Sequence, residues 1–113
     1  LLTRIKDDYS IKKIYITENG CSYKIGPDKN KIIDDNKRID YHSSHILSLK
    51  KAIKNGVPCD GYFAWSLMDN FEWCEGFQQR FGLIWVDFNS LERIPKKSFF
   101  WYKNLINKNG EDE

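Results

Sequence analysis

The sequence predicts an α/β protein built around a parallel sheet, because two apolar runs flank a stretch with helical spacing. Residues 14–17 (IYIT) and 61–67 (GYFAWSL) are short and rich in β-branched and aromatic residues, as strands are. Residues 36–55 between them have the apolar periodicity of a helix. Strands joined by a crossover helix lie parallel, and helices cover the faces of such sheets.

The first third of the chain predicts a helix end, a strand and a loop. Residues 1–9 carry apolar side chains three and four positions apart, as in the last turns of an amphipathic helix. Residues 14–17 form a continuous rather than an alternating run, which predicts a strand covered on both faces. Residues 20–35 are rich in Gly, Pro, Asp and Asn and predict a polar loop.

The central helix has a recognisable buried face and a recognisable end. An apolar stripe through Ile46, Leu49 and Ile53 predicts the buried face of the helix at 36–55. Gly56 stands where a left-handed residue ends a helix. Basic residues in the last turns suit the negative end of the helix dipole: Lys50, Lys51 and Lys54.

The last third predicts a hairpin and a final helix. Residues 81–88 (FGLIWVDF) read as an extended segment that pairs in a small hairpin with residues near Arg93. Pro95 suits the first turn of the helix that follows. Residues 107–113 predict a charged, frayed tail. The buried face of the final helix is expected to consist of Phe99, Tyr102, Leu105 and Ile106.

The length indicates an incomplete barrel. An eight-unit (β/α)8 barrel of ~250 residues uses about 30 residues per unit, so this chain holds about three units. Two central strands are too few for such a sheet. We therefore expect residues 1–113 to be a piece of a larger barrel. The chain begins with Leu rather than Met, which also suggests a fragment.

Composition excludes several classes of partner. The 18 basic and 16 acidic residues are interspersed and give a net charge of +2, which argues against nucleic acid and anionic membranes. No apolar run approaches the ~18 residues of a membrane helix, and no signal peptide opens the chain. The cysteines Cys21, Cys59 and Cys74 favour neither a disulfide framework nor a zinc site. We expect reduced thiols, a cytoplasmic location, and neither metal nor cofactor.

Acidic and aromatic residues follow both predicted strands at the point where each ends. Glu18 follows residues 14–17, and a cluster lies at or just after the end of residues 61–67: Trp65, Asp69, Asn70, Glu72 and Trp73. The carboxyl ends of parallel barrel strands meet on one rim. Carboxylates beside indole faces suit a carbohydrate, because acids bind hydroxyls or attack the anomeric carbon while indoles stack on sugar rings. Considered alone, a strand-end glutamate is more often a cap or a rim ion pair.

Other chemistry-bearing residues fit structural roles. Trp85 and Trp101 lie within a predicted strand and a predicted helix without polar neighbours, which favours core positions. His42 and His45 are three residues apart, but no third ligand is spaced to join them in a metal site, so packing or a solvated face is favoured. Asp87 fits a strand-end residue that accepts hydrogen bonds from loop amides.

Five motifs together resemble the C-terminal quarter of family 1 glycoside hydrolases, the β-glucosidase group. In order and spacing these are ITENG (16–20), RIDYHSSHI (38–46), GYFAWSLMDNFEW (61–73), RFGLIWVDF (80–88) and R-x-PKKSFFWYKNLI (93–106). The resemblance covers nearly the whole chain apart from the acidic tail. It implies that residues 1–113 form the C-terminal part of a single TIM-barrel domain, from about helix 6 to helix 8. It implies a retaining β-glucosidase whose substrate is a β-glucoside or related oligosaccharide.

The resemblance implies a role for each matching residue. Glu18 aligns with the nucleophile that forms a covalent glycosyl-enzyme. Trp65 resembles the indole platform beneath the non-reducing sugar, with a cis peptide to Ser66. Glu72 resembles the carboxylate that binds the outer hydroxyls of that sugar, with Trp73 beside it and Phe81 lining the same pocket. An acid at position 72 argues for unphosphorylated glycosides, because it would repel a 6-phosphate.

One departure from the family bears on activity. The acid/base of the family lies in an Asn-Glu-Pro motif on an earlier strand, and this sequence contains no such motif. General acid catalysis is commonly worth ~100- to 10,000-fold, so we expect the chain alone to be inactive and to need the missing N-terminal part of the barrel. The alternative is a non-catalytic carbohydrate-binding or interaction remnant, and a thioglycosidase would differ at the missing acid/base position. In isolation we expect aggregation or a molten state.

Overall fold

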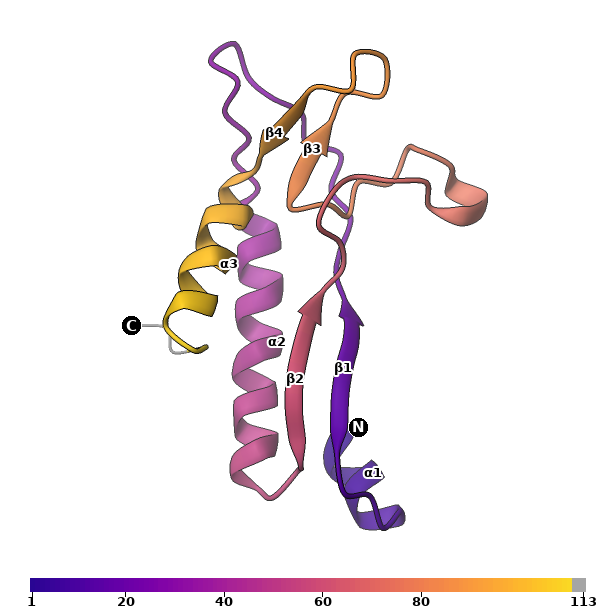
Figure 1. The fold of residues 1–113 in the computed structure, drawn as a ribbon, viewed down its shortest axis with the longest axis vertical. Helices are drawn as coiled ribbons and strands as arrows, with labels where there is room; N and C mark the ends of the chain where they lie inside the picture. Colours follow the sequence, from indigo (N-terminus) through magenta and orange to yellow (C-terminus); the bar gives the residue numbers. More distant parts are fainter. Residues whose placement is uncertain (111–113) are drawn as a thin grey trace.

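Two parallel strands with a long helix beside them form the centre of the structure, a computed structural model that describes residues 1–110 (Figure 1). The predicted order of helix, strand, helix, strand, hairpin and helix is confirmed. The elements are α1 (Leu2–Asp8), β1 (Ile14–Asn19), α2 (Asn36–Lys54), β2 (Cys59–Ala64), a 3₁₀ helix η1 (Trp73–Glu75), β3 (Ile84–Val86), β4 (Arg93–Pro95) and α3 (Lys97–Asn107).

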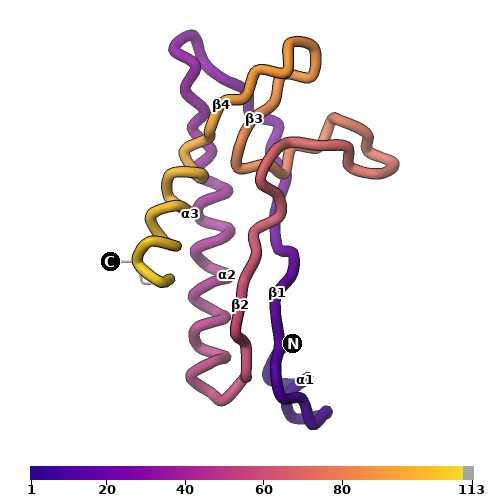
Figure 2. The backbone as a smooth tube through the Cα atoms, in the orientation of Figure 1, coloured from indigo at the N-terminus to yellow at the C-terminus, as the bar shows by residue number. Residues whose placement is uncertain are grey.

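The β1–β2 pair has the geometry of a crossover unit with two irregularities in its register, one between Ile14 and Tyr15 and one between Ile16 and Asn19. Figure 2 shows the backbone leaving β1, returning along α2 and rising again through β2, so the two strands run in the same direction. Ile16 pairs with Tyr62, and Asn19 pairs with Ala64. Three steps along β1 therefore match two along β2, which places one extra residue, a β-bulge, between Ile16 and Asn19.

One face of this sheet is open, contrary to the expectation that the first strand is covered on both faces. Tyr15 on β1 is 49% exposed and Phe63 on β2 is 57% exposed. Both occupy the same face, since Gly61 lies against the Tyr15 ring and the Phe63 ring. The expectation fails because the described residues contribute no element over this face. A continuous apolar run predicts what a strand is suited to contact, and here that contact is missing.

The strand limits also differ from the sequence expectation. The second strand ends at Ala64, so Trp65 lies beyond it rather than within it. Of residues 81–88, only Ile84–Val86 form a strand. The predicted hairpin is confirmed, because β3 pairs antiparallel with β4 at Arg93–Pro95.

The placement of Pro95 in the first turn of the last helix is wrong. Pro95 belongs to β4, where it pairs with Ile84 at the edge of the hairpin, a position that tolerates a residue without an amide proton. Lys96 remains extended, with φ −80° and ψ 167°, and the helix begins at Lys97.

The buried face and the tail of α3 are correct only in part. Leu105 is buried and Phe99 and Tyr102 are half-buried, but Ile106 is 60% exposed. The predicted tail starts too early, because residue 107 still belongs to the helix and the amide of Gly110 donates to the Leu105 carbonyl at 2.8 Å. Residues 111–113 of the predicted tail lie outside the described residues.

The central helix ends as predicted but buries different side chains. Gly56 has φ +89°, the left-handed conformation that glycine adopts most easily. Within the predicted stripe, Ile46 and Leu49 are half-buried while Ile53 is exposed. The fully buried side chains of α2 are polar and lie in its first half: Arg38 and His42.

The apolar core is small and the molecule is flat. Its dimensions are 49 × 36 × 18 Å and its radius of gyration is 16.0 Å, against about 13 Å for a typical domain of this length. None of the helices within residues 1–110 is long and apolar enough to cross a membrane. Among residues 1–110, few apolar side chains are buried: Ile33, Val57, Leu83, Val86 and Leu105.

Candidate functional site

Glu18 lies near the end of β1, and Trp65 directly follows the last residue of the neighbouring strand β2. The backbone amide of Trp65 donates to the carbonyl of Asn19, the residue after Glu18, at 2.8 Å. Glu18 is exposed and Trp65 is half-buried. A carboxylate and an indole from adjacent parallel strands therefore share one edge, as the sequence predicted.

The backbone around Trp65 is closely packed against the end of β1. The peptide bond between Trp65 and Ser66 is cis, as the resemblance implied. A Cβ atom at Gly20 would lie 1.9 Å from the Trp65 carbonyl oxygen, a distance that no side chain tolerates. Glycine at position 20 therefore permits this close approach.

Phe81 is brought to the same place through the backbone. The amide of Ser66 donates to the Phe81 carbonyl at 3.2 Å, and the amide of Leu83 donates to the Ser66 carbonyl at 2.8 Å. The segment that carries Phe81 thus runs alongside the residue after Trp65. Three of the predicted site residues, from three separate segments, are held together: Glu18, Trp65 and Phe81.

Glu72 and Trp73 lie on a loop that extends beyond the carboxyl ends of β1 and β2 (Figure 1). The amide of Glu72 donates to the Gly76 carbonyl at 2.7 Å, which closes a tight turn. Trp73 is 82% exposed. Among the described residues, neither Glu72 nor Trp73 has a hydrogen bond to another predicted site residue, so the loop places them on the same side as Glu18 and Trp65 without tying them to these residues.

Asp69 is a buried anchor beneath this loop rather than a rim residue. One carboxylate oxygen accepts from Lys96 Nζ at 2.9 Å and from the Gly82 amide at 2.9 Å. The other accepts from Arg80 Nη1 at 2.8 Å. Burial and the neighbouring Arg38 charge lower the pKa of Lys96 to about 8, against the opposing effect of Asp69.

A second buried ion pair organises the loop at residues 20–35, which the sequence described only as polar. Asp35 Oδ2 lies 2.8 Å from Arg38 Nε, and both side chains are fully buried. Arg38 also donates to three carbonyls, those of Cys21, Arg80 and Phe81. This guanidinium therefore joins the loops on either side of the site.

Sequence reasoning missed this network because its members are far apart in the chain. Asp35 accepts hydrogen bonds from the amide of Ser98, at 2.9 Å, and from its hydroxyl. The one local signal was the spacing of Asp35 and Arg38 at the start of a helix, where they are three residues apart.

The two histidines of α2 have different environments. His42 is fully buried, its Nδ1 lies 2.8 Å from the Tyr62 hydroxyl, and burial lowers its pKa to about 4. His45 is exposed, and its Nδ1 lies 2.7 Å from the Tyr41 carbonyl. Within residues 1–110 no group of three His, Cys, Asp or Glu side chains is arranged to hold a metal ion.

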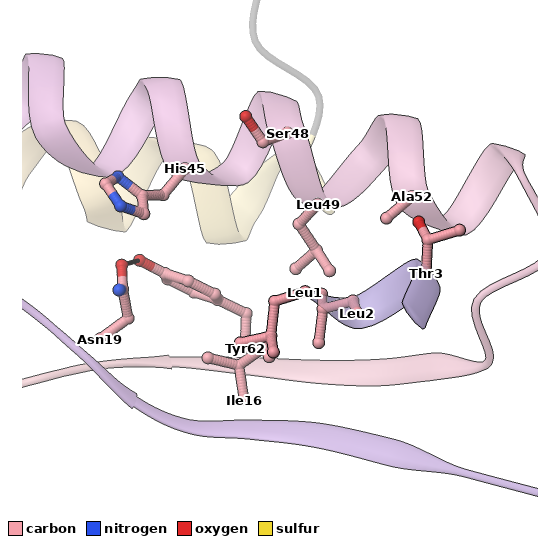
Figure 3. Close-up of a pocket in the computed structure, with 10 residues that line it drawn as sticks. All are labelled: Leu1, Leu2, Thr3, Ile16, Asn19, His45, Ser48, Leu49, Ala52 and Tyr62. Atoms are coloured by element: carbon pink, nitrogen blue, oxygen red, sulfur yellow. Dashed lines mark hydrogen bonds between the residues drawn. The ribbon is translucent and has the colours of Figure 1, made fainter. Parts of the chain in front are cut away.

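A cavity of about 360 Å³ lies on the side of the sheet that faces α2, between α1, α2 and the strands (Figure 3). Its lining is mostly apolar and includes Ile16, Leu49 and Tyr62, with Asn19 at one end. Glu18 and Trp65 do not line it. This cavity is therefore separate from the acidic and aromatic edge.

Comparison with known proteins finds a family that matches nearly the whole chain. The family model described as glycosyl hydrolase family 1 matches residues 1–111. The 1,4-beta-D-glucan glucohydrolase of Thermotoga neapolitana is 46% identical over 110 residues, 97% of this chain and 25% of that protein. The 6-phospho-beta-galactosidase of Leptotrichia buccalis is 50% identical over 105 residues, 92% of this chain and 22% of that protein.

Solved structures agree. The family 1 β-glucosidase from Thermotoga maritima superposes with a TM-score of 0.97 at 44% identity, over 99% of this chain and 25% of that one. The same enzyme in complex with deoxynojirimycin gives a TM-score of 0.96 at 44% identity, over 98% of this chain and 25% of that one. The chain thus spans about a quarter of the length of these relatives and corresponds to part of a TIM barrel. It belongs to glycosyl hydrolase family 1.

Proposed function

We propose that the complete protein containing this chain is a retaining β-glucosidase in which Glu18 is the nucleophile. The observation that carries the proposal is the placement of Glu18 and Trp65 at the carboxyl ends of two adjacent parallel strands, joined by the hydrogen bond from the Trp65 amide to the Asn19 carbonyl. Active sites of TIM barrels lie at this end. An exposed carboxylate beside an indole gives a sugar ring both an attacking group and a flat surface for stacking.

The reaction uses two carboxyl groups, of which this chain supplies one. A Glu18 oxygen attacks the anomeric carbon as the bond to the leaving oxygen breaks, and a covalent glycosyl-enzyme forms. The leaving oxygen takes its proton from an acid, which then, as a base, activates the water that releases the sugar. The Asn-Glu-Pro motif that carries this acid in the family is absent from residues 1–113. The chain alone is therefore expected to be inactive.

The remaining site residues bind the sugar. Trp65 forms the platform under the non-reducing sugar, and Phe81, tied to Ser66 through its carbonyl, lines the same pocket. Glu72 accepts hydrogen bonds from the outer hydroxyls, and Trp73 lies next to it on the same loop. The loop that carries Glu72 and Trp73 is exposed in this chain, so we expect it to close onto the sugar only within the complete barrel.

The negative charge of this loop favours an unphosphorylated glycoside as the substrate. Glu72 lies in the turn at residues 72–76 together with a second acid, Glu75, and the Glu72 carboxylate would repel a sugar 6-phosphate. The 50% identity to a 6-phospho-beta-galactosidase makes phosphorylated galactosides the competing candidate. Overall identity does not separate the two candidates, and the acidic turn supports the unphosphorylated substrate.

The test uses a chimera, here called the completed barrel, in which residues 1–113 replace the matching quarter of the Thermotoga maritima β-glucosidase. We expect it to hydrolyse aryl β-glucosides at least about 100-fold more efficiently, in kcat/KM, than the corresponding 6-phosphates. A 2-deoxy-2-fluoro-glucoside, which slows release of the covalent intermediate, should label Glu18 in a mass-spectrometric peptide map. Glu72→Gln should reduce the ratio of kcat/KM between glucosides and their 6-phosphates. Glu92→Gln, in the β3–β4 hairpin, should leave this ratio unchanged.

Three results would contradict parts of the proposal. If Glu18→Gln retained full activity, or the label appeared on another residue, Glu18 would not be the nucleophile. If the completed barrel bound glucosides but hydrolysed none, this segment would be a carbohydrate-binding remnant. A preference for 6-phosphogalactosides would contradict the argument from the acidic turn.

A further inference from the structure

The residue after Glu18 is held by side chains on the far side of the sheet. Asn19 Oδ1 accepts a hydrogen bond from the Tyr62 hydroxyl at 2.7 Å, and Asn19 Nδ2 donates to the Tyr41 hydroxyl at 3.2 Å. Its backbone carbonyl accepts from the Trp65 amide at 2.8 Å. Figure 3 shows the Asn19 side chain meeting Tyr62 beneath α2.

His42 completes this chain of hydrogen bonds. A tyrosine hydroxyl has one proton, and that of Tyr62 is donated to Asn19. The contact of 2.8 Å between His42 Nδ1 and the Tyr62 oxygen is therefore made by an Nδ1–H donor. His42 Nε2 is then an unprotonated nitrogen, buried and without a hydrogen-bond partner among the described residues. A neutral imidazole at this site agrees with its lowered pKa of about 4.

The bulge in β1 links the position of Asn19 to the direction of the Glu18 side chain. The extra residue lies between Ile16 and Asn19, so Thr17 and Glu18 are both exposed while the residues on either side of them are half-buried. A bulge redirects side chains locally and leaves one residue without its place in the ladder. Fixing Asn19 toward α2 sets where the bulge ends and therefore the direction in which Glu18 leaves the sheet.

We propose that Asn19, Tyr62 and His42 form a positioning anchor that fixes the direction of the Glu18 carboxylate from behind the sheet. This inference rests on the proposed role of Glu18 as nucleophile. None of the three residues is proposed to touch the sugar. They act through the backbone between positions 18 and 19.

The expected effect is on the chemical step. A displacement of about 1 Å in a reacting group can cost ~100-fold in rate. Tyr62→Phe removes one oxygen and keeps the ring, so we expect kcat of the completed barrel to fall by about 10- to 100-fold with KM within about twofold. Tyr102→Phe is the matched control, because the Tyr102 hydroxyl contacts the Tyr62 carbonyl at 3.4 Å and does not contact Asn19. It should change kcat by less than about twofold.

A double substitution separates positioning from general stability. In a Glu18→Gly background, added azide attacks the anomeric carbon of a dinitrophenyl glucoside in place of the carboxylate, and the dinitrophenolate leaves without a proton. Positioning of Glu18 no longer matters there, so Tyr62→Phe should change the azide-dependent rate by less than about twofold. An equal loss in both backgrounds would overturn the proposal.

Two variants of His42 provide an independent test if Tyr62→Phe does not fold. The amide of Asn places a donor close to the position of His Nδ1, whereas Leu places none. We expect His42→Asn to keep most of kcat and His42→Leu to lose it as Tyr62→Phe does. Equal kcat in these two variants would contradict the anchor. Failure of Glu18→Gly to lose activity, or to recover it with azide, would instead contradict the proposed function.

Discussion

Lys96 Nζ lies 2.9 Å from Asp69 Oδ1, and both side chains are buried. The contact joins the residue before α3 to the loop that follows Trp65. Arg80 holds the second carboxylate oxygen of Asp69 at 2.8 Å and also donates to the Val86 carbonyl at 2.8 Å. The loop behind the site is therefore fixed by charges from two other segments rather than by apolar packing.

Removing the Asp69 charge should destabilise the completed barrel strongly. Asp69→Asn leaves Lys96 buried without a counter-ion, and breaking a buried pair in this way typically costs about 3–5 kcal/mol. Urea unfolding measures the change. Asp34→Asn is the matched control, because its pair with Lys97, at 3.5 Å, is exposed and should contribute less than about 1 kcal/mol. Equal effects of the two variants would show that Asp69 is not an anchor.

The elements that the sequence predicted well are those with local causes. Periodicity and β-branched runs place the two strands and the long helix, and Gly56 ends that helix with the expected positive φ. The order of the strands predicted that Glu18 and Trp65 follow adjacent parallel strands, and the structure places them there. The assignment of roles to Glu18 and Glu72 by resemblance stays a prediction, since geometry alone does not show what either residue does.

The elements that the sequence predicted poorly depend on partners far along the chain. The Asp35 carboxylate is satisfied by Ser98, which is 63 residues away, and Asp69 by Lys96, which is 27 away. No pattern of spacing reveals such pairs, so Asp35 was placed in a polar loop and Asp69 on a rim. Pro95 was misplaced because a proline is acceptable both in a first helical turn and at a sheet edge.

The contact between Gly20 and Trp65 predicts a strong effect from a single methyl group. In Gly20→Ala the new Cβ would meet the Trp65 carbonyl oxygen at 1.9 Å, so the backbone beside the cis peptide must move. We expect at least a 10-fold loss of kcat/KM in the completed barrel. Gly26→Ala is the control, because its Cβ would find nothing closer than 3.9 Å. Similar kinetics for both variants would contradict the close approach.

The buried state of His42 predicts a specific dependence of stability on pH. Its pKa is about 4 in the folded protein, below the usual value of 6.5, so between these values the unfolded chain binds more protons. The stability that neutral His42 contributes is complete above about pH 6.5 and is lost as the pH falls toward 4. Urea unfolding of the completed barrel across this range should show a slope of up to about one proton. His42→Asn should remove that slope, and an unchanged slope would mean that other groups cause it.

The open face of the sheet predicts how residues 1–113 behave on their own. Tyr15 and Phe63 are 49% and 57% exposed on that face, only five apolar side chains among residues 1–110 are buried, and the radius of gyration exceeds that of a typical domain. Two strands with one uncovered face do not support independent stability.

We expect the isolated chain to bind ANS, to lack near-ultraviolet circular dichroism and to unfold without a cooperative transition, or to aggregate. Addition of the remaining part of a family 1 barrel should restore cooperative unfolding, because it covers this face. A sharp unfolding transition of a monomeric 113-residue chain would contradict the prediction and would show that the buried ion pairs alone hold the segment together.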